Sequence, residues 1–424
     1  MLDPARLLAD PDGARRALGR RGEAARAALK PFFVLEARRR DLIRRTDELR
    51  AERNRANEGM KSADKTAQAF AEARERLRAV SNQIKQLETR LREAEERRDE
   101  VLLRVPNWPA DAVPDGADGE ANVEVARWGE PPRLDFAPRA HWELGERLGI
   151  LDFERAAKVS GARFAFLRGM GARLERALIQ MMMDLHGGRG YVELWPPFLV
   201  KPEAMVGTGQ LPNLAADAFR TEGGELYLVP TAEVPVTNYH REEILPVEAL
   251  PLRYVAYSPC FRAEAGSHGQ DVRGLIRQHQ FDKVELVKFS RPETSYDELE
   301  SLRADAEEVL RRLGLHYRVM ALCAGDLGFA SARTYDLEVW LPGQDAFREI
   351  SSCSNFEDYQ ARRARIRFKE GTGKPRLAHT LNGSAMAIGR TMVAILEQCQ
   401  RRDGSVVVPE ALRPYLGVEA IGPV

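Results

Sequence analysis

The sequence predicts an α+β protein, in which a long antiparallel helical hairpin precedes a mainly antiparallel sheet with flanking helices. Three observations predict this class. An apolar heptad repeat occupies the first hundred residues, the composition changes after Val105, and short β-rich runs then alternate with helices. The chain has 424 residues, 44% of them hydrophobic and 30% charged, so it can hold two or three domains.

The hairpin is predicted from apolar residues at coiled-coil spacing, every seven residues in a first run and alternately three and four residues apart in a second. These residues are Leu35, Leu42, Leu49 and Ala56, then Phe70, Ala73, Leu77, Val80, Ile84, Leu87, Leu91 and Ala94. The polar segment Asn57–Lys65 interrupts the pattern, so two helices of about 40 Å each, at about 1.5 Å per residue, should fold back on each other. From Lys30 to Arg104 there are 20 basic and 15 acidic residues, an excess of five (20 − 15). Taken alone, this segment favours a solvated interaction arm over an arm that grips a polyanion.

The composition predicts three parts of the chain. Residues 1–105 form the helical arm, residues 106–132 a Pro/Gly/Asp-rich linker, and residues 133–424 the α+β domain. The strands of that domain are expected in the runs YVELWPPFLV, ELYLVPT, LRYVAYSPCFRAE, LIRQHQFDKVELVKF, HYRVMAL and TYDLEVWLP.

The sequence predicts a cytoplasmic protein. The amino-terminal residues are interrupted by charge and proline, which leaves no apolar core for a signal peptide, and no apolar run reaches the length of a membrane span. The four cysteines, at 260, 323, 353 and 399, form no CxxC pair. Structural zinc and a disulfide framework are therefore not expected.

The stretch Cys260–Glu285 is predicted to form two strands around a glycine-containing loop, with Arg262 and Glu264 on one face of the first strand. On the second strand, one face carries the charged or aromatic residues Arg277, His279, Phe281, Lys283 and Glu285. A solvated strand face has a similar pattern. The loop GSHGQDVRG and a phenylalanine among arginines favour a mobile flap over an anionic ligand and a stacking surface for a base.

Two further stretches carry charge in unusual places. Thr380–Gln398 reads as small residues leading into a buried helix, with Arg390 on the stripe of Gly383, Met386 and Val393, so this arginine should be buried and need an anion. The stretch FREISSCSN places Glu349 near several hydroxyl groups, which suits Mg²⁺ or is simply a polar strand end. No GxxxxGK[ST] motif occurs, so a nucleotide would not be held by a P-loop.

Taken together and in this order, these motifs resemble those of the bacterial type of seryl-tRNA synthetase. GYVELWPPFLV, with Pro196 and Pro197, resembles motif 1 of class II synthetases, the strand at the dimer interface. FRAE with RQHQF resembles motif 2, and GSAMAIGR resembles motif 3. TAE at 231–233 and HQFDKVE narrow the resemblance to the serine enzyme, and so does the helical hairpin, which in that family holds the long variable arm of the tRNA. The resemblance runs along the whole chain and implies a class II synthetase sheet.

The resemblance also implies roles for individual residues. Arg262, Glu349 and Arg390 would be catalytic, with Arg262 on the α-phosphate and Arg390 at the γ-phosphate. Arg277 would hold the phosphate tail, and Phe281 would stack on adenine. The implied ATP-binding set is Arg262, Ala263, Glu264, Arg277, Phe281, Glu349, Ile350, Ser351, Ser352 and Arg390. The implied serine-binding set is Thr231, Ala232, Glu233, Glu285, Asn382 and Ser384. Glu349 and Ser352 match the Mg²⁺ positions.

The implied ligands are ATP, Mg²⁺, L-serine and tRNA(Ser), and the implied assembly is a homodimer with no membrane association. Whether tRNA(Sec) is also charged stays open. Two alternatives from other classes remain at this stage. One is a coiled-coil interaction protein with a degenerate synthetase fold, which predicts loss of charged site residues. The other is an amino acid:carrier protein ligase, whose members lack the long arm.

Overall fold

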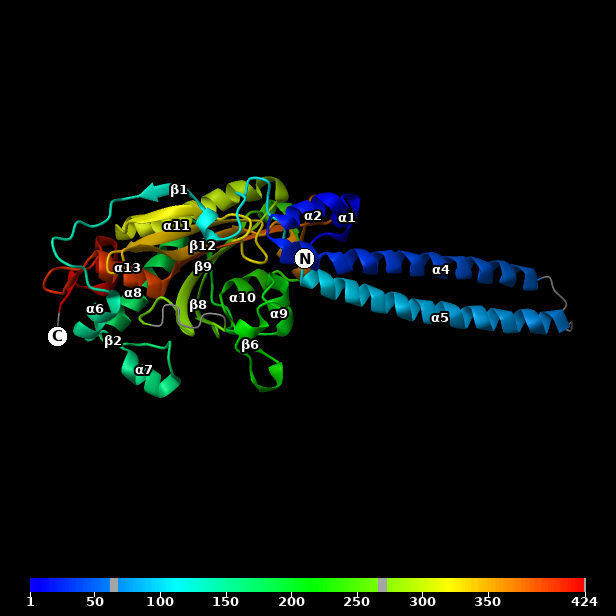
Figure 1. Ribbon diagram of the computed structural model, residues 1–424, viewed down its shortest axis with the longest axis horizontal. Coiled ribbons are helices and arrows are strands. Elements are labelled where there is room, and N and C mark those ends of the chain that lie inside the picture. Colours follow the sequence, from blue (N-terminus) through cyan, green and yellow to red (C-terminus); the bar gives the residue numbers. More distant parts are fainter. Residues whose placement is uncertain (62–67, 266–272, 423–424) are drawn as a thin grey trace. The chain divides into compact units, whose positions relative to one another are not determined.

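The computed structural model describes residues 1–61, 68–265 and 273–422 (Figure 1). The chain divides into two compact units. Gly22–Val105 form one unit, which we call the arm. Met1–Arg21 and Pro106–Val424 together form the other, which we call the sheet unit.

The arm contains a short helix, α3 (Glu23–Ala28), and two long ones, α4 (Lys30–Lys61) and α5 (Gln68–Leu103). At about 1.5 Å per residue, α4 and α5 are about 48 and 54 Å long, which exceeds the expected 40 Å. Ion pairs between them join Arg39 to Glu95 at 2.9 Å, Arg50 to Glu88 at 2.9 Å and Glu52 to Arg76 at 2.8 Å. Residue numbers along α5 fall as those of their α4 partners rise, so the two helices are antiparallel. The predicted hairpin is confirmed.

The predicted seam of the hairpin is confirmed, because each of its apolar residues is buried or half-buried. The seam also contains a charged residue that the repeat did not predict. Glu36 is 4% exposed and pairs with Arg39, Arg40 and Arg98. The expected helix break at Asn57 is wrong, because α4 continues to Lys61. One glycine costs a helix only about 1 kcal/mol, and the rest of the predicted turn, residues 62–65, lies outside the described residues.

The predicted division at residues 105 and 132 differs from the compact units in two respects. Helices α1 (Pro4–Ala9) and α2 (Pro11–Gly19) group with the sheet unit, where the Arg21 guanidinium donates hydrogen bonds to carbonyls of residues 107, 327, 328 and 331. Within the expected linker, β1 (Val123–Trp128) pairs with β10 (Tyr317–Ala321). The Pro/Gly-rich composition therefore begins where the arm ends, at Val105. The residues predicted as a linker, 106–132, belong to the sheet unit.

The sheet unit is built on eight strands in the order β1-β10-β11-β12-β15-β9-β8-β4. Neighbouring strands are antiparallel except β4 and β8, so the predicted mainly antiparallel sheet is confirmed. The remaining bounds are β4 Val192–Leu194, β8 Leu252–Phe261, β9 Gln280–Ser290, β11 Arg333–Leu341, β12 Ala346–Asn355 and β15 His379–Ala387.

Smaller elements complete the sheet unit. The helices are α6 His141–Arg147, α7 Phe153–Ser160, α8 Met170–Gly187, α9 Pro202–Thr208, α10 Glu233–Asn238, α11 Ser295–Leu313, α12 Tyr359–Ala364, α13 Ile388–Gln398 and α14 Arg413–Leu416. The short strands are β2 Leu151–Asp152, β3 Phe166–Leu167, β5 Leu199–Val200, β6 Tyr227–Leu228, β7 Ile244–Pro246, β13 Arg367–Lys369, β14 Arg376–Leu377, β16 Val406–Val407 and β17 Ala420–Ile421.

The two faces of the sheet have different partners. On one face, strand residues such as Val284 and Leu286 pack with the apolar stripes of α8, α11 and α13 in the main core, and these helices flank the sheet in Figure 1. Alternate residues of β9 point to the other face, where Val287 and Phe289 pack in a smaller cluster with α10 and α12. Lys283 and Glu285 share that second face but carry charge. The second face therefore combines an apolar end with a polar one.

Three predicted elements need correction. Residues 380–387 belong to strand β15, so Gly383 and Met386 do not share a helical stripe with Arg390. The returning strand begins at Gln280, so Arg277 and His279 lie before it. Similarly, β8 ends at Phe261, which leaves Arg262 and Glu264 beyond the strand. In each case, the small or charged residues at the end of a strand are compatible with the strand and with the neighbouring loop or helix. Pairing with the adjacent strands determines where the strand ends.

Candidate active site

A cavity of about 650 Å³ lies over the polar face of the sheet, a volume suited to a small-molecule ligand. It is lined by residues from the stretches at 231–233, 262–281, 349–352 and 382–390, which the sequence singled out. The lining residues that had been predicted are Thr231, Glu233, Arg262, Glu264, Arg277, Phe281, Glu349, Ile350, Ser352, Asn382, Ser384 and Arg390. The structure therefore brings twelve of the predicted site residues to one cavity.

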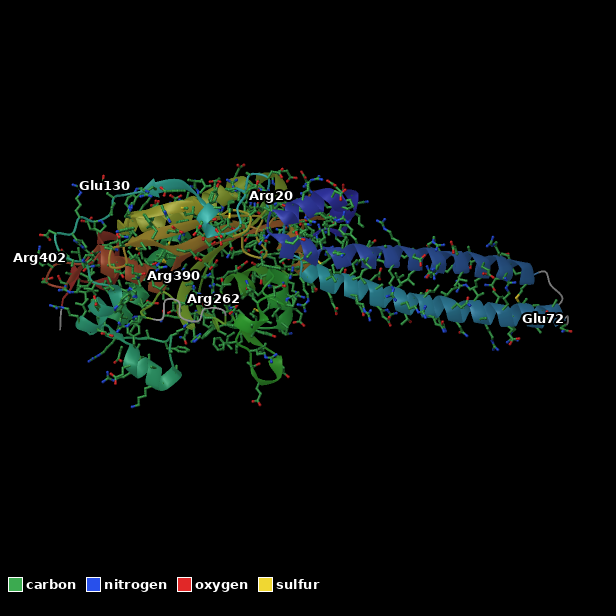
Figure 2. All side chains as sticks on the ribbon, in the orientation of Figure 1. Arg20, Glu72, Glu130, Arg262, Arg390 and Arg402 are labelled. Atoms are coloured by element: carbon green, nitrogen blue, oxygen red, sulfur yellow. The ribbon has the colours of Figure 1, made fainter. Side chains whose placement is uncertain are left out.

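Two arginines at the cavity wall, Arg262 and Arg390, are labelled near each other in Figure 2. Arg262 comes directly after β8. Its Nε donates to the Pro230 carbonyl at 3.4 Å, and its Cζ lies 5.2 Å from the centroid of the Phe281 ring. Arg390 lies in the first turn of α13 and donates to the carbonyls of Glu349 at 2.7 Å and Ile276 at 3.2 Å. Backbone carbonyls thus hold both side chains in place.

A third arginine, Arg277, also lines the cavity and donates to the Glu264 carboxylate at 2.7 Å. The three guanidinium groups make this end of the cavity suitable for a polyanion such as a triphosphate. The expectation that Arg390 is buried is wrong, since 27% of its side chain is exposed. Because the residue opens α13 instead of lying within it, its guanidinium points out of the buried helix and toward the cavity.

The half-buried ring of Phe281 lies on β9 beside the Arg262 guanidinium, at this basic end of the cavity. An aromatic ring at a cavity wall offers a stacking face that is indifferent to the identity of a base. The glycine-rich loop that was predicted to cover the ligand falls on residues 266–274, of which 266–272 lie outside the described residues.

The other end of the cavity is formed by Thr231, Glu233, Asn382 and Ser384. Behind them lies Glu285, which is fully buried and is not among the lining residues. Its carboxylate accepts hydrogen bonds from Thr231 Oγ1 at 3.2 Å and Asn382 Nδ2 at 2.6 Å, and it pairs with Lys283. The structure thus places Glu285 beneath the predicted serine pocket, where it holds the side chains that form its wall.

Glu233 is the carboxylate that faces the cavity at this end. Burial and, after it, the nearby Glu285 carboxylate raise its pKa to about 7, although Gln360, Lys283 and Arg262 oppose the shift. A pKa near neutrality means that this group responds to a cationic ligand. An ammonium group beside it would favour the ionised form.

The acidic group at the arginine-rich end is larger than predicted. Glu349 and Ser352 line the cavity, and Asp336 on β11 lies behind them, opposite Ser352 in the β11–β12 pairing. Burial, followed by the Glu349 charge, raises the Asp336 pKa well above its usual range. Its Oδ1 atom is buried without a hydrogen-bond partner among the described residues. Two carboxylates, a hydroxyl and one unsatisfied oxygen form a donor set that suits a hard cation.

Three predicted site residues besides Glu285 do not line the cavity. Ala232 is buried, Ala263 donates its N–H to the Asp217 carbonyl, and Ser351 donates to the Ser384 carbonyl at 2.6 Å. Ala263 and Ser351 thus bond to the backbone carbonyls of two lining residues, Asp217 and Ser384. Ser351 does not line the cavity because it and Ser352 point to opposite faces of the strand.

Several lining residues were missed by sequence reasoning. The segment Met205–Gln210 contributes four of them, and Asp217, Gln278 and Lys283 contribute further polar groups. The signal available for the first segment was the pair of glycines in VGTGQ, of which Gly209 adopts a φ of 91° at the end of α9. Lys283 had been placed on the correct strand face but assigned no role.

An antiparallel sheet with this cavity on its polar face defines a class II aminoacyl-tRNA synthetase, and residues 218–399 match the family described as the tRNA synthetase class II core domain (G, H, P, S and T). Residues 1–109 match the seryl-tRNA synthetase N-terminal domain. The chain belongs to the seryl-tRNA synthetase family.

Relatives and solved structures agree with this membership. A serine–tRNA ligase from Sorangium cellulosum is 58% identical over 99% of both chains, and one from Thermodesulfovibrio yellowstonii is 56% identical over 99% of this chain and all of the relative. The crystal structure of seryl-tRNA synthetase from Pyrococcus horikoshii complexed with ATP matches with a TM-score of 0.96, 37% identity and full coverage of both chains. The cytoplasmic enzyme from Naegleria fowleri in complex with AMP matches with a TM-score of 0.88 and 29% identity, over 98% and 96% of the two chains.

Proposed function

We propose that the protein activates L-serine with ATP and transfers the seryl group to tRNA(Ser). The observation that carries this proposal is a single cavity with three arginines and a phenylalanine at one end and Thr231, Glu233 and Asn382 at the other. Exchange of pyrophosphate into ATP in the presence of serine tests the first step, and charging of total tRNA tests the second. The two alternatives lose their support, because the charged site residues and the long arm are both present.

In the first step, a serine carboxylate oxygen would attack the α-phosphorus of ATP and the bond to pyrophosphate would break. The products are seryl-adenylate and pyrophosphate. The serine carboxylate is already ionised at neutral pH, so the attack needs no general base. Catalysis then consists of positioning the reactants and stabilising the developing phosphate charge, which Arg262 and its neighbours can do.

In the second step, a terminal ribose hydroxyl of the tRNA would attack the seryl carbonyl carbon. The new ester bond forms as the bond to AMP breaks, AMP leaves with the electron pair, and the hydroxyl proton passes to the AMP phosphate or to water. The same arginines would bind the phosphate of AMP in both steps. One cavity can therefore serve both reactions.

We assign Mg²⁺ to the acidic group at the phosphate end, because its oxygens fit a hard cation. Glu349 and Ser352 would hold the ion, with Asp336 behind them. When bound, Mg²⁺ would neutralise charge on the triphosphate. The residues themselves orient this end: the Arg390 guanidinium holds the Glu349 backbone carbonyl, which fixes the strand that carries both donors.

We assign the amino-acid pocket to the opposite end. Glu233 would accept hydrogen bonds from the serine ammonium, and the hydroxyl would meet Thr231, Asn382 or Ser384. Alanine would leave these buried polar groups without a partner, which is a strong basis for rejecting it. Glu285 would act through Thr231 and Asn382, whose orientation it fixes.

We assign the tRNA to the arm. Residues 30–104 of the arm have an excess of five basic residues (20 − 15), which suits a polyanion, and residues 1–109 match a family model named for the seryl-tRNA synthetase N-terminal domain. The long variable arm of tRNA(Ser) is the proposed partner of this helical arm. We propose tRNA(Sec) as a second substrate, bound through the same contact. These substrates place the protein in the cytoplasm. No helix among the described residues has the length and apolarity to cross a membrane.

We also propose a homodimer formed through the segment that resembles motif 1. Strand β4 is at the edge of the sheet, and Val192, Trp195 and Leu199 expose 57%, 72% and 47% of their surfaces. Contiguous exposed apolar side chains at a sheet edge suit a protein interface. The native mass in solution measures this directly.

Replacing Phe281 with Ala should raise the KM for ATP. The loss of a stacking contact worth about 1–3 kcal/mol corresponds to a KM increase of about five- to 150-fold. The KM for serine should stay within about twofold, since the ring lies away from the amino-acid end. Steady-state pyrophosphate exchange measures both constants. An equal rise in the two would indicate that the ring is part of the core.

The KM for serine should depend on pH through Glu233. Below the pKa of about 7 this carboxyl is protonated in the free protein, so it must lose a proton before it can accept the serine ammonium. KM should therefore be constant above pH 7 and rise up to about tenfold for each unit below it. Glu233→Gln should raise KM and remove this dependence, while the KM for ATP should show no such inflection. An unchanged inflection in the Gln variant would assign it to another group.

A further inference from the structure

A line of three side chains connects the core of the sheet unit to the amino-acid end of the cavity. Thr380 Oγ1 on β15 donates to Gln360 Oε1 on α12 at 2.7 Å, and Gln360 Nε2 donates to Glu233 Oε1 on α10 at 2.7 Å. The same Nε2 donates to the Thr208 carbonyl at the end of α9, at 3.1 Å. One amide thus joins four elements at a single point.

The orientation of this amide is determined by its partners. The Thr208 carbonyl can only accept a hydrogen bond, so the Gln360 nitrogen, not its oxygen, must face it. The second N–H of the amide then points to Glu233, and the amide oxygen points to the Thr380 hydroxyl. A flipped amide would set an oxygen against both the carbonyl and the carboxylate, which is repulsive on two sides.

Burial makes this arrangement costly to disturb. Gln360 and Thr380 are both 0% exposed, and neither is among the residues that line the cavity. Glu233 is 6% exposed and lines it. The two inner residues therefore do not line the cavity. Gln360 can act on it through the Glu233 carboxylate or through the backbone of Thr208, which also lines it, and only the bond to Glu233 reaches a titratable group.

We propose that Gln360 is a positioning residue for the amino-acid pocket, which fixes the Glu233 carboxylate and favours its ionised form, and that Thr380 fixes Gln360. This inference rests on the proposed function, because it assumes that Glu233 receives the serine ammonium. Gln360 and Thr380 would thus contribute to substrate recognition without touching the substrate.

The surrounding charges explain why Glu233 needs such a donor. Glu285 on β9 repels a negative charge on Glu233, whereas Lys283 on β9 and Arg262 after β8 attract one. Burial and the Glu285 charge raise the Glu233 pKa, the hydrogen bond from Gln360 opposes that rise, and the resulting pKa is about 7. Without that bond the carboxyl should be protonated at a higher pH and should lose its fixed orientation.

The test is the pH dependence of the KM for serine in pyrophosphate exchange, compared between three variants and the parent protein. Gln360→Met keeps the length of the side chain but removes both donors. It should raise the KM at pH 7 about tenfold and move the inflection up by about one pH unit, the expected effect of losing a hydrogen bond to a charged group. The KM for ATP should stay within about twofold, because the ATP end of the cavity is unchanged.

Thr380 provides a matched pair in case the first variant folds poorly. Thr380→Val keeps the shape but loses the hydroxyl, so it should shift the inflection in the same direction by a smaller amount. Thr380→Ser keeps the hydroxyl and should restore the parent profile. A purely structural role would instead change kcat, thermal stability and both KM values together without moving the inflection.

The outcomes separate this inference from the proposed function. If the parent protein does not exchange pyrophosphate with serine, the proposed function fails. If it does, and neither Gln360→Met nor Thr380→Val moves the inflection relative to Thr380→Ser, the positioning role of Gln360 is overturned.

Discussion

Shortening the helical arm should abolish tRNA charging while serine-dependent pyrophosphate exchange stays within about twofold of the parent. In the proposed variant, a short Gly-Ser turn replaces residues 38–97. The ion pair between Glu36 Oε2 and Arg98 Nη1, at 3.6 Å, is kept and still joins the bases of the two helices. Loss of several phosphate contacts should lower kcat/KM for tRNA by about 10³-fold or more. Exchange should survive because no cavity-lining residue lies in the arm.

The salt dependence of charging provides the control for this prediction. Binding to a polyanion releases counterions, so the logarithm of kcat/KM for tRNA should fall linearly with the logarithm of salt concentration in the parent protein. Residual charging by the shortened protein should have a shallower slope. A folded short variant that charges tRNA normally would mean that the arm is the solvated interaction arm its composition first suggested.

Replacing Arg262 with Ala should lower kcat for seryl-adenylate formation by about 10²–10³-fold, the usual effect of removing one preorganised donor from a developing negative charge. The side chain lines the cavity, and its guanidinium is held by the Pro230 carbonyl at 3.4 Å and lies over the Phe281 ring. Single-turnover formation of the adenylate at saturating ATP measures this step. The free energy of unfolding should change little, because the side chain is only half-buried.

Two variants sharpen the result. Arg262→Lys keeps the charge but not the planar fork, so its rate should lie between those of the parent and the Ala variant. Arg253→Ala is a control within β8, the strand that Arg262 directly follows, because Arg253 pairs with Glu298 and does not line the cavity. It should lose stability without losing rate. Equal losses of rate in Arg253→Ala and Arg262→Ala would indicate damage to β8 instead of a lost contact with phosphate.

The sequence was most informative where one physical pattern applied alone. The seam from Leu35 to Ala94 required a helical hairpin, because apolar residues repeated at a single period. The alternation along β9 correctly placed Phe281, Lys283 and Glu285 on one face of the sheet. Both patterns depend only on local geometry, and neither required knowledge of the neighbouring elements.

The sequence was less informative where neighbours decide the structure. Residues 380–387 are small enough for a helix or a strand, and pairing with β9 and β12 makes them a strand. Glu285 lies on the predicted face, but the depth at which Thr231, Lys283 and Asn382 cover it could not be read from the chain. Asp336 and Gln360 went unnoticed because each lies beneath a residue that had been identified, at a distance in sequence that no motif spans.

The central claim, that the cavity joins serine to ATP, is tested most directly by pyrophosphate exchange into ATP with a panel of amino acids. The parent protein should exchange with serine and at least about 10²-fold less with alanine and glycine, because buried polar groups reject ligands that lack the hydroxyl to pair with them. Glu233→Gln should weaken the serine signal, and Arg262→Ala should remove most of it. Equal exchange with alanine and serine, or exchange that Arg262→Ala leaves intact, would contradict the account.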